Sequence, residues 1–153
     1  MDDIDKKILT ELQKNSSQPL SELSKKVGLS NTPCWNRIKK LEEKKIIKSK
    51  SIIIDNKKIN LPITVFLSIS IQNHTEVWLK NFQKVVNKYD QIIEVHRLTG
   101  SNSDYQITIL SPSIEEYDKF QQSLIKEIEC TNMSSHISLQ TIKKNDKYPL
   151  NFI

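Results

Sequence analysis

The side chains best suited to bind a ligand lie in a short polar and basic run near residue 36. Asn36 and Arg37 carry the amide and guanidinium groups that make paired hydrogen bonds with adenine and guanine edges. Lys39 and Lys40 carry charges that contact DNA phosphates, which position a protein without specifying sequence. The run therefore predicts a DNA-binding surface, and the alternative is a basic helix face that only contacts water. The expected DNA-binding residues are Ser30, Asn31, Thr32, Pro33, Asn36, Arg37, Lys39 and Lys40.

Two helices and a tight turn are expected to position this run. In the first helix Leu20, Leu23 and Val27 recur at helical spacing, so one stripe is apolar. Gly28 can adopt the left-handed backbone that ends a helix sharply, and Pro33 suits the first turn of the next helix. A side chain among residues 30–32 can cap that second helix. The second helix is expected to bury Cys34, Ile38 and Leu41. This is the plan of a helix-turn-helix, whose second helix enters the major groove.

Basic residues are concentrated in the N-terminal third of the chain. Residues 1–58 hold 14 Lys and Arg against 8 Asp and Glu, whereas residues 59–153 hold 9 against 10. This asymmetry is typical of a nucleic-acid-binding module joined to a near-neutral domain. A genome rich in A+T would raise lysine throughout and does not explain the asymmetry. The sequence has no signal peptide and no apolar run that could span a bilayer, so we expect a cytoplasmic protein.

Hydrophobic periodicity predicts an α+β fold in two domains. Residues 1–50 are expected to form the helix-turn-helix domain, with a first helix at 2–14 capped by Asp2 or Asp3. Residues 51–62 are expected to form a strand and hinge, and the β-branched run at 46–54 suits short, wing-like strands. In the second domain, 63–153, strands are expected at 63–71, 92–98, 105–110 and 133–143, and helices at 76–89 and 114–128. Val77 is expected to face inward in the first of these helices, or Trp78 beside it.

The resulting βαββαβ order is that of a ferredoxin-like domain, with two helices on one face of an antiparallel sheet. The other face, which includes Phe66, is expected to be apolar enough to need a cover. A second copy of the chain, packed sheet to sheet, would supply that cover.

The sequence contains no arrangement expected of a catalytic or metal site. Its histidines and cysteines lack the spacing of metal ligands, and no nucleophile–base arrangement or phosphate-binding glycine loop occurs. We therefore predict no enzymatic activity, no cofactor and no metal, with both cysteines reduced and buried. The residues concerned are Cys34, His74, His96, Cys130 and His136.

An ordered set of motifs resembles the Lrp/AsnC, or feast/famine, family of transcriptional regulators. The motifs are Asp-Asp-Ile-Asp-Lys-Lys-Ile-Leu at 2–9, Val-Gly-Leu-Ser at 27–30 and Thr-Pro-Cys-Trp-Asn-Arg-Ile-Lys-Lys-Leu-Glu at 32–42. The resemblance implies a regulator that binds double-stranded DNA as a homodimer, often assembled further into octamers. The family has glycine where Lys45 stands, and lysine adopts the left-handed conformation less easily, so the helix is expected to end differently. Asn60 also replaces a family glycine, but asparagine tolerates positive φ.

The same resemblance implies an effector site for an amino acid or a related metabolite. Family members carry Thr-Gly-x-x-Asp-Tyr/Phe at the hairpin between the second and third strands. Here Thr99-Gly100 and Asp104-Tyr105 match, with one additional residue between them. Gly100 would let backbone N–H groups approach a carboxylate, and Asp104 would bind an ammonium. The alternative is an ordinary hairpin turn. The expected effector-binding residues are Leu98, Thr99, Gly100, Ser101, Asn102, Asp104 and Ser135, the last in place of a family threonine.

Two other functions are compatible with parts of this pattern. An architectural DNA-binding protein would use the C-terminal domain only to oligomerise, and the longer loop between Gly100 and Asp104 favours it. Tetrapyrrole decarboxylases share the two-domain plan, but they carry His-Asn-Tyr near the second strand, where this chain has Glu-Val-His-Arg at 94–97. The enzyme is the least favoured of the three functions.

Overall fold

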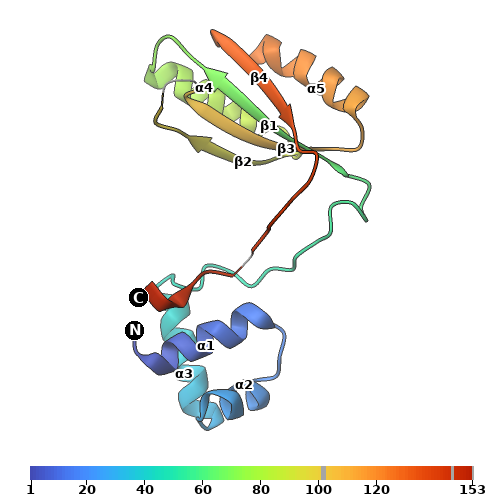
Figure 1. Ribbon diagram of the computed structural model, residues 1–153. Coiled ribbons are helices and arrows are strands. Elements are labelled where there is room, and N and C mark those ends of the chain that lie inside the picture. The colour runs from blue at the N-terminus through green and yellow to red at the C-terminus, as the bar shows by residue number, and fades with distance from the viewer. Residues whose placement is uncertain (101–102, 146, 153) are drawn as a thin grey trace. The chain divides into compact units, whose positions relative to one another are not determined.

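A computed structural model describes residues 1–100, 103–145 and 147–152 and divides the chain into two compact units (Figure 1). Unit 1 comprises residues 1–53 together with 142–153, which we call the C-terminal segment. Unit 2 comprises residues 54–141. The predicted second domain extended to residue 153, so the structure differs there: the C-terminal segment belongs to the N-terminal unit.

Unit 1 contains the three predicted helices. They are α1 (Asp3–Lys14), α2 (Leu20–Val27) and α3 (Asn31–Glu43). Their apolar stripes meet in one core, as the helical spacing predicts. The buried residues of this core are Ile8, Leu9, Leu23, Val27, Cys34, Ile38 and Leu41.

The turn between α2 and α3 has the backbone that the sequence predicts. Gly28 is left-handed, with φ of 74°, and the N–H of Leu29 donates to the carbonyl of Ser24 at 2.9 Å. Ser30 occupies the N-cap position of α3 but makes no side-chain capping hydrogen bond. The predicted side-chain cap is therefore absent, and the side-chain oxygen of Asn31 accepts a hydrogen bond from Ser24.

The end of α3 also adopts a left-handed residue, although it is a lysine. Lys45 has φ of 54°. The N–H of Ile46 donates to the carbonyl of Leu41, and that of Lys45 to Glu42, both at 2.9 Å. This is a Schellman motif, so the prediction of a different helix end is wrong. Asn60, with φ of 63°, confirms the expected positive φ in the linker.

The C-terminal segment packs on α1. The side-chain amide of Gln13 donates to the carbonyl of Tyr148 at 3.3 Å and accepts from the N–H of the same residue at 2.5 Å. A short 3-10 helix follows at Leu150–Phe152, and Leu150 packs against the unit 1 core. Leu150 therefore completes a core built mainly from the first 47 residues.

The strand predicted for 46–54 is absent, and the described chain has no strand between α3 and β1 (Ile63–Ser70). Ile52 and Ile53 are strongly exposed. The β-branched composition is right for a strand, but one chain supplies no neighbouring strand with which to form backbone hydrogen bonds.

Unit 2 has the predicted βαββαβ order. After β1 come α4 (Glu76–Val86), β2 (Ile92–Arg97), β3 (Tyr105–Ser111), α5 (Ile114–Glu127) and β4 (Asn132–Ile137). The sheet order is β2-β3-β1-β4, and every neighbouring pair is antiparallel. In the centre, Leu67 of β1 lies opposite Ile107 of β3 and Ser135 of β4.

Both helices cover one face of this sheet (Figure 1). Trp78 packs there against Phe82 and Tyr105, with ring centroids 4.8 and 5.3 Å away, whereas Val77 is 79% exposed. Of the two alternatives for α4, Trp78 is thus the inward residue. β4 is shorter than predicted, because the chain leaves the sheet soon after Ile137.

The uncovered face is more polar than expected. Phe66 is exposed on it, but its partners in register are Thr108 on β3 and His136 on β4. The prediction of an apolar face therefore holds for Phe66 itself and not for its register partners.

Candidate nucleic-acid interface and effector site

The exposed face of α3 is the candidate nucleic-acid interface. Cys34, Ile38 and Leu41 anchor the helix in the unit 1 core. The predicted DNA-binding residues face solvent, apart from Arg37, which is half-buried. The exposed members are Ser30, Asn31, Thr32, Pro33, Asn36, Lys39 and Lys40. The structure therefore brings the predicted set onto one helix and its N-terminal turn.

Asn31 connects the two helices of the motif. Its side-chain oxygen accepts a hydrogen bond from the hydroxyl of Ser24, 2.7 Å away. Ser24 is almost completely buried and also donates to the carbonyl of Ser21. This contact fixes the first turn of α3 relative to α2.

Arg37 contacts two carboxylates of α1. Its Nη1 donates to Asp2 Oδ2 at 2.7 Å and to Asp5 Oδ1 at 2.8 Å. Asp5 and then Asp2 raise the pKa of the Arg37 guanidinium. The backbone N–H of Asp5, followed by Arg37, lowers the pKa of the Asp2 carboxyl. Arg37 and Asp2 are thus stabilised in their charged forms.

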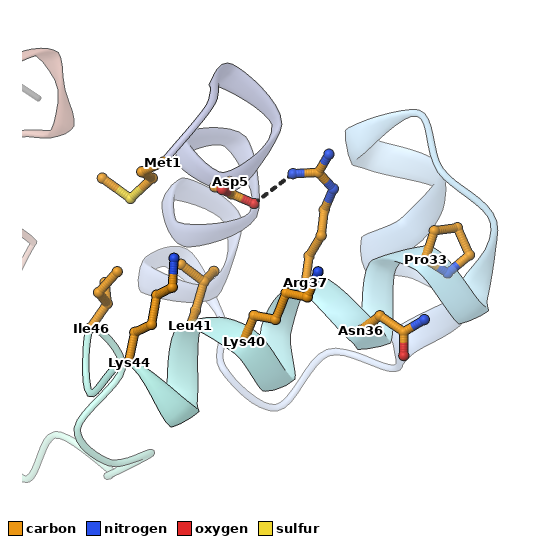
Figure 2. A pocket seen from close by; sticks show the side chains of 9 residues that line it. All are labelled: Met1, Asp5, Pro33, Asn36, Arg37, Lys40, Leu41, Lys44 and Ile46. Atoms are coloured by element: carbon orange, nitrogen blue, oxygen red, sulfur yellow. Dashed lines mark hydrogen bonds and ion pairs between the residues drawn. The ribbon is translucent and has the colours of Figure 1, made fainter.

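A groove of about 370 Å³ lies beside these residues (Figure 2). Figure 2 shows Arg37 extending toward Asp5, whereas Asn36 projects away from it. Lys40 on the last turn of α3 and Lys44 at its C-cap add positive charge to the groove, which favours an anionic ligand. The lining residues are Met1, Asp5, Pro33, Asn36, Arg37, Lys40, Leu41, Lys44 and Ile46.

Lys39 lies near the ring of Trp35, which is not among the predicted DNA-binding residues. Its Nζ is 5.2 Å from the centroid of Trp35, within cation–π distance. Trp35 is 50% exposed on α3. The i, i+4 spacing of the two residues is the signal that could have indicated this contact.

At the candidate effector site, Asp104 is already hydrogen-bonded within its own unit. Its Oδ2 accepts from the N–H of Ile71 at 2.8 Å, and its Oδ1 is 3.3 Å from Nε2 of His74. Its backbone N–H donates to the carbonyl of Ile69, and its carbonyl accepts from the N–H of Leu98. Asp104 therefore joins the hairpin to the end of β1, and sequence reasoning gave no indication of His74 as a neighbour.

The other predicted effector residues are distributed over two places. Leu98, Thr99 and Gly100 are exposed at the end of β2, and Gly100 has φ of 156°. Ser101 and Asn102 lie outside the described residues.

Ser135 makes its hydrogen bonds with α5 rather than with the hairpin. Its hydroxyl contacts that of Tyr117 at 2.5 Å and accepts from Nε2 of Gln121 at 3.1 Å. Burial raises the pKa of the Tyr117 hydroxyl. Asp104 and Ser135 thus make their hydrogen bonds with different elements.

The described residues contain no group of three His, Cys, Asp or Glu side chains that could hold a metal ion. Cys34 and Cys130 are free thiols; Cys34 is buried as predicted, whereas Cys130 is half-buried. Burial raises the pKa of both thiols. No helix in the described part of the chain is both long and apolar enough to span a membrane.

Two family models match the chain in order, one on the helices of unit 1 and one from β1 into the C-terminal segment. One, described as winged helix-turn-helix DNA-binding, matches residues 1–48. The other, described as the Lrp/AsnC ligand binding domain, matches residues 64–148.

Known proteins resemble this chain over nearly its whole length. The HTH-type transcriptional regulator Zrp of Zymomonas mobilis is 39% identical and is aligned over 97% of both chains. The structure of an AsnC family transcriptional regulator from Agrobacterium tumefaciens is 39% identical, with a TM-score of 0.95 over 100% of this chain and 99% of that one. The structure of a Neisseria meningitidis transcriptional regulator in complex with L-methionine is 28% identical, with a TM-score of 0.93 over 99% and 98% of the two chains.

Proposed function

The chain belongs to the Lrp/AsnC family of DNA-binding transcriptional regulators, and we propose that α3 enters the major groove of its DNA site. The proposal rests on the amphipathic nature of α3. Its apolar face is buried in unit 1, and its opposite face exposes Asn36, Lys39 and Lys40. Asn36 is suited to contact a base edge, and the two lysines are suited to contact phosphates. Ser30, Thr32 and Pro33 lie at the start of the helix, where such helices approach the bases.

Base preferences measured on a randomised duplex library test this proposal. Asn36→Ala is expected to relax discrimination at one base pair by about 1–3 kcal/mol. Lys40→Ala is expected to weaken binding to all sequences alike and to reduce the salt dependence by about one phosphate contact. Lys126→Ala, an exposed lysine on α5 of unit 2, is the matched control and should change neither. Equal and uniform losses for Asn36→Ala and Lys40→Ala would contradict base contact by Asn36.

We further propose that the active form is a homodimer, assembled into a higher oligomer, in the cytoplasm. A twofold axis would present two copies of α3 to two half-sites of one DNA duplex. The uncovered face of the unit 2 sheet, with Phe66 exposed, is available to a second copy. Analytical ultracentrifugation with and without DNA tests the assembly, and a protein that stays monomeric in both would contradict it.

An amino acid or a related metabolite is the proposed effector, bound by unit 2 around residues 98–104 and Ser135. The match to a ligand-binding family over residues 64–148 supports this, as does the L-methionine complex of the Neisseria relative. Exposed Thr99 and Gly100 would contact the ligand carboxylate, and Asp104 the ammonium group. No enzymatic step forms part of the proposal.

An architectural protein without an effector is the second candidate, and one observation favours it. The carboxylate of Asp104 already accepts from Ile71 and lies near His74, so an ammonium ligand would compete with existing partners.

A thermal-shift screen of the twenty amino acids, with L-methionine as the first probe, separates the two candidates. A ligand at 100 times its Kd adds about 2.7 kcal/mol to stability. Asp104→Asn keeps an acceptor for the N–H of Ile71 and removes the charge, so it should abolish the shift while it still folds. Asp104→Ala removes the acceptor as well and is the comparison for folding. The absence of a shift with every amino acid would favour the architectural protein.

A further inference from the structure

One guanidinium nitrogen connects α3 to the N-terminus of α1. Nη1 of Arg37 lies 2.7 Å from Asp2 Oδ2 and 2.8 Å from Asp5 Oδ1. We call these residues the Asp2–Asp5–Arg37 cluster. The Arg37 side chain is only 31% exposed, although it comes from the surface helix that is proposed to contact DNA.

Both carboxylates are held in place by α1 itself. Asp2 Oδ1 accepts from the N–H of Asp5 at 2.9 Å, and Asp5 Oδ2 accepts from the N–H of Asp2 at 3.2 Å. Together these two bonds form the capping box of α1. Each carboxylate thus uses one oxygen for the helix end and the other for Arg37. All four carboxylate oxygens of Asp2 and Asp5 therefore accept a hydrogen bond. The capping box fixes the positions of the two oxygens that accept from Arg37.

Among the described residues, two neighbours of Arg37 on α3 have side chains without such intramolecular partners. In the described part of the chain, Asn36 makes no side-chain hydrogen bond and Lys40 makes no ion pair. Both are exposed. Their polar groups are therefore available to a ligand, whereas Nη1 of Arg37 already donates to two charged partners.

A guanine contact by Arg37 would also expose DNA to unfavourable charge. If Nη1 of Arg37 left the cluster, Asp2 and Asp5 would be two uncompensated negative charges beside α3, and like charges across an interface oppose binding. With Arg37 in place, the cluster carries one net negative charge, beside Lys40 and Lys44 of the same groove.

We infer that Arg37 is a positioning residue, which fixes α3 on the N-terminus of α1, and that Asn36 rather than Arg37 discriminates between bases. This inference rests on the proposed function of α3 as the DNA-contacting helix. It replaces the predicted Arg37–guanine contact by an intramolecular role for the same side chain.

A double-mutant cycle in the free protein tests the positioning role without DNA. Arg37→Gln and Asp5→Asn are each expected to lower the melting temperature, and the double variant is expected to lower it by less than their sum. Lys119→Gln and Glu116→Gln, an exposed ion pair on α5, form the matched control cycle, with effects that add. Additive effects at Arg37 and Asp5 would overturn the inference.

The randomised duplex library then separates positioning from base contact. Arg37→Gln is expected to weaken binding to all sequences and to leave the base preferences unchanged. Asn36→Ala is expected to change the preference at one base pair by about tenfold or more. A loss of guanine preference in Arg37→Gln, with the other base preferences unchanged, would overturn the inference. A wild-type protein without sequence preference would contradict the proposed function, and the cycle in the free protein would still decide the role of Arg37.

Discussion

Lys45 ends α3 in a left-handed conformation, with φ of 54°, and thereby satisfies the carbonyls of Leu41 and Glu42. A residue with a Cβ atom pays roughly 1–2 kcal/mol for this conformation, whereas glycine adopts it freely. We expect Lys45→Gly to raise the free energy of unfolding of unit 1 by about 1 kcal/mol in a denaturant titration. Lys44→Gly is the matched control, because Lys44 has φ of −76° and should gain nothing. Equal stabilisation by both changes would contradict the strain at Lys45.

The capping box of α1 predicts a pH dependence. The N–H of Asp5, and then Arg37, lowers the pKa of Asp2 from its ordinary value of 3.8. A carboxyl with a lowered folded-state pKa stabilises the fold above its unfolded pKa, and the stabilisation is lost as the pH falls through the folded pKa. The melting-temperature difference between wild type and Asp2→Asn is therefore expected to be present above about pH 4 and to vanish in more acidic solution. A melting-temperature difference that persists at low pH would contradict the assignment.

Local side-chain roles were predictable where they depend on neighbours in sequence, and others were not. Gly28 as the left-handed turn residue and an aspartate cap for α1 follow from spacing; the sequence left the cap open between Asp2 and Asp3, and the structure shows Asp2. The contact between Arg37 and Asp5 joins residues far apart in sequence, so it depends on how α1 and α3 pack. The approach of His74 to Asp104 has the same origin.

The helices differ in whether the N-cap side chain makes a capping hydrogen bond, and stability measurements can detect this difference. Ser113 Oγ accepts from the N–H of Glu116 at 3.1 Å at the start of α5, whereas Ser30 makes no such bond at the start of α3. We expect Ser113→Ala to destabilise unit 2 by about 1 kcal/mol, because an N-cap hydrogen bond is lost. Ser30→Ala should leave unit 1 within about 0.5 kcal/mol of wild type. Similar losses in both variants, measured by denaturant unfolding, would contradict this difference.

Elements with a buried stripe could be predicted from the sequence, and elements that need a distant partner could not. The alternation of Val65, Leu67 and Ile69 predicts β1 because each of these side chains is buried under the helices. The run at 46–54 has the composition of a strand but no partner strand within the chain. In α4, the orientation of Trp78 is fixed by packing on Phe82 and by its indole N–H donating to the carbonyl of Glu129.

At the scale of the whole molecule, the chain passes from unit 1 to unit 2 and back again. Hydrophobic periodicity in the sequence does not predict that the C-terminal segment packs on unit 1, because this segment forms only a short 3-10 helix. Its place follows from two contacts that the sequence does not indicate: Leu150 on the unit 1 core, and Gln13 on the backbone of Tyr148.

Removal of residues 148–153 is expected to destabilise unit 1 and not unit 2. The loss of Leu150 packing and of the two hydrogen bonds of Gln13 amounts to about 1–3 kcal/mol. Hydrogen exchange should therefore become faster in α1 while the exchange of β1 and β3 stays unchanged. Tyr148→Ala is the control, because Gln13 bonds only to the backbone of Tyr148, whose side chain is 82% exposed. Unchanged exchange of α1 in the truncated chain would contradict the docking of the C-terminal segment.

The return of the C-terminal segment to unit 1 has a consequence for the order in which the protein is made. Domains generally fold as units while the chain is synthesised from its N-terminus. Here the three helices of unit 1 emerge from the ribosome first, but Leu150 and the backbone partner of Gln13 emerge only after all of unit 2. A nascent chain can therefore complete unit 1 only after unit 2 has been synthesised.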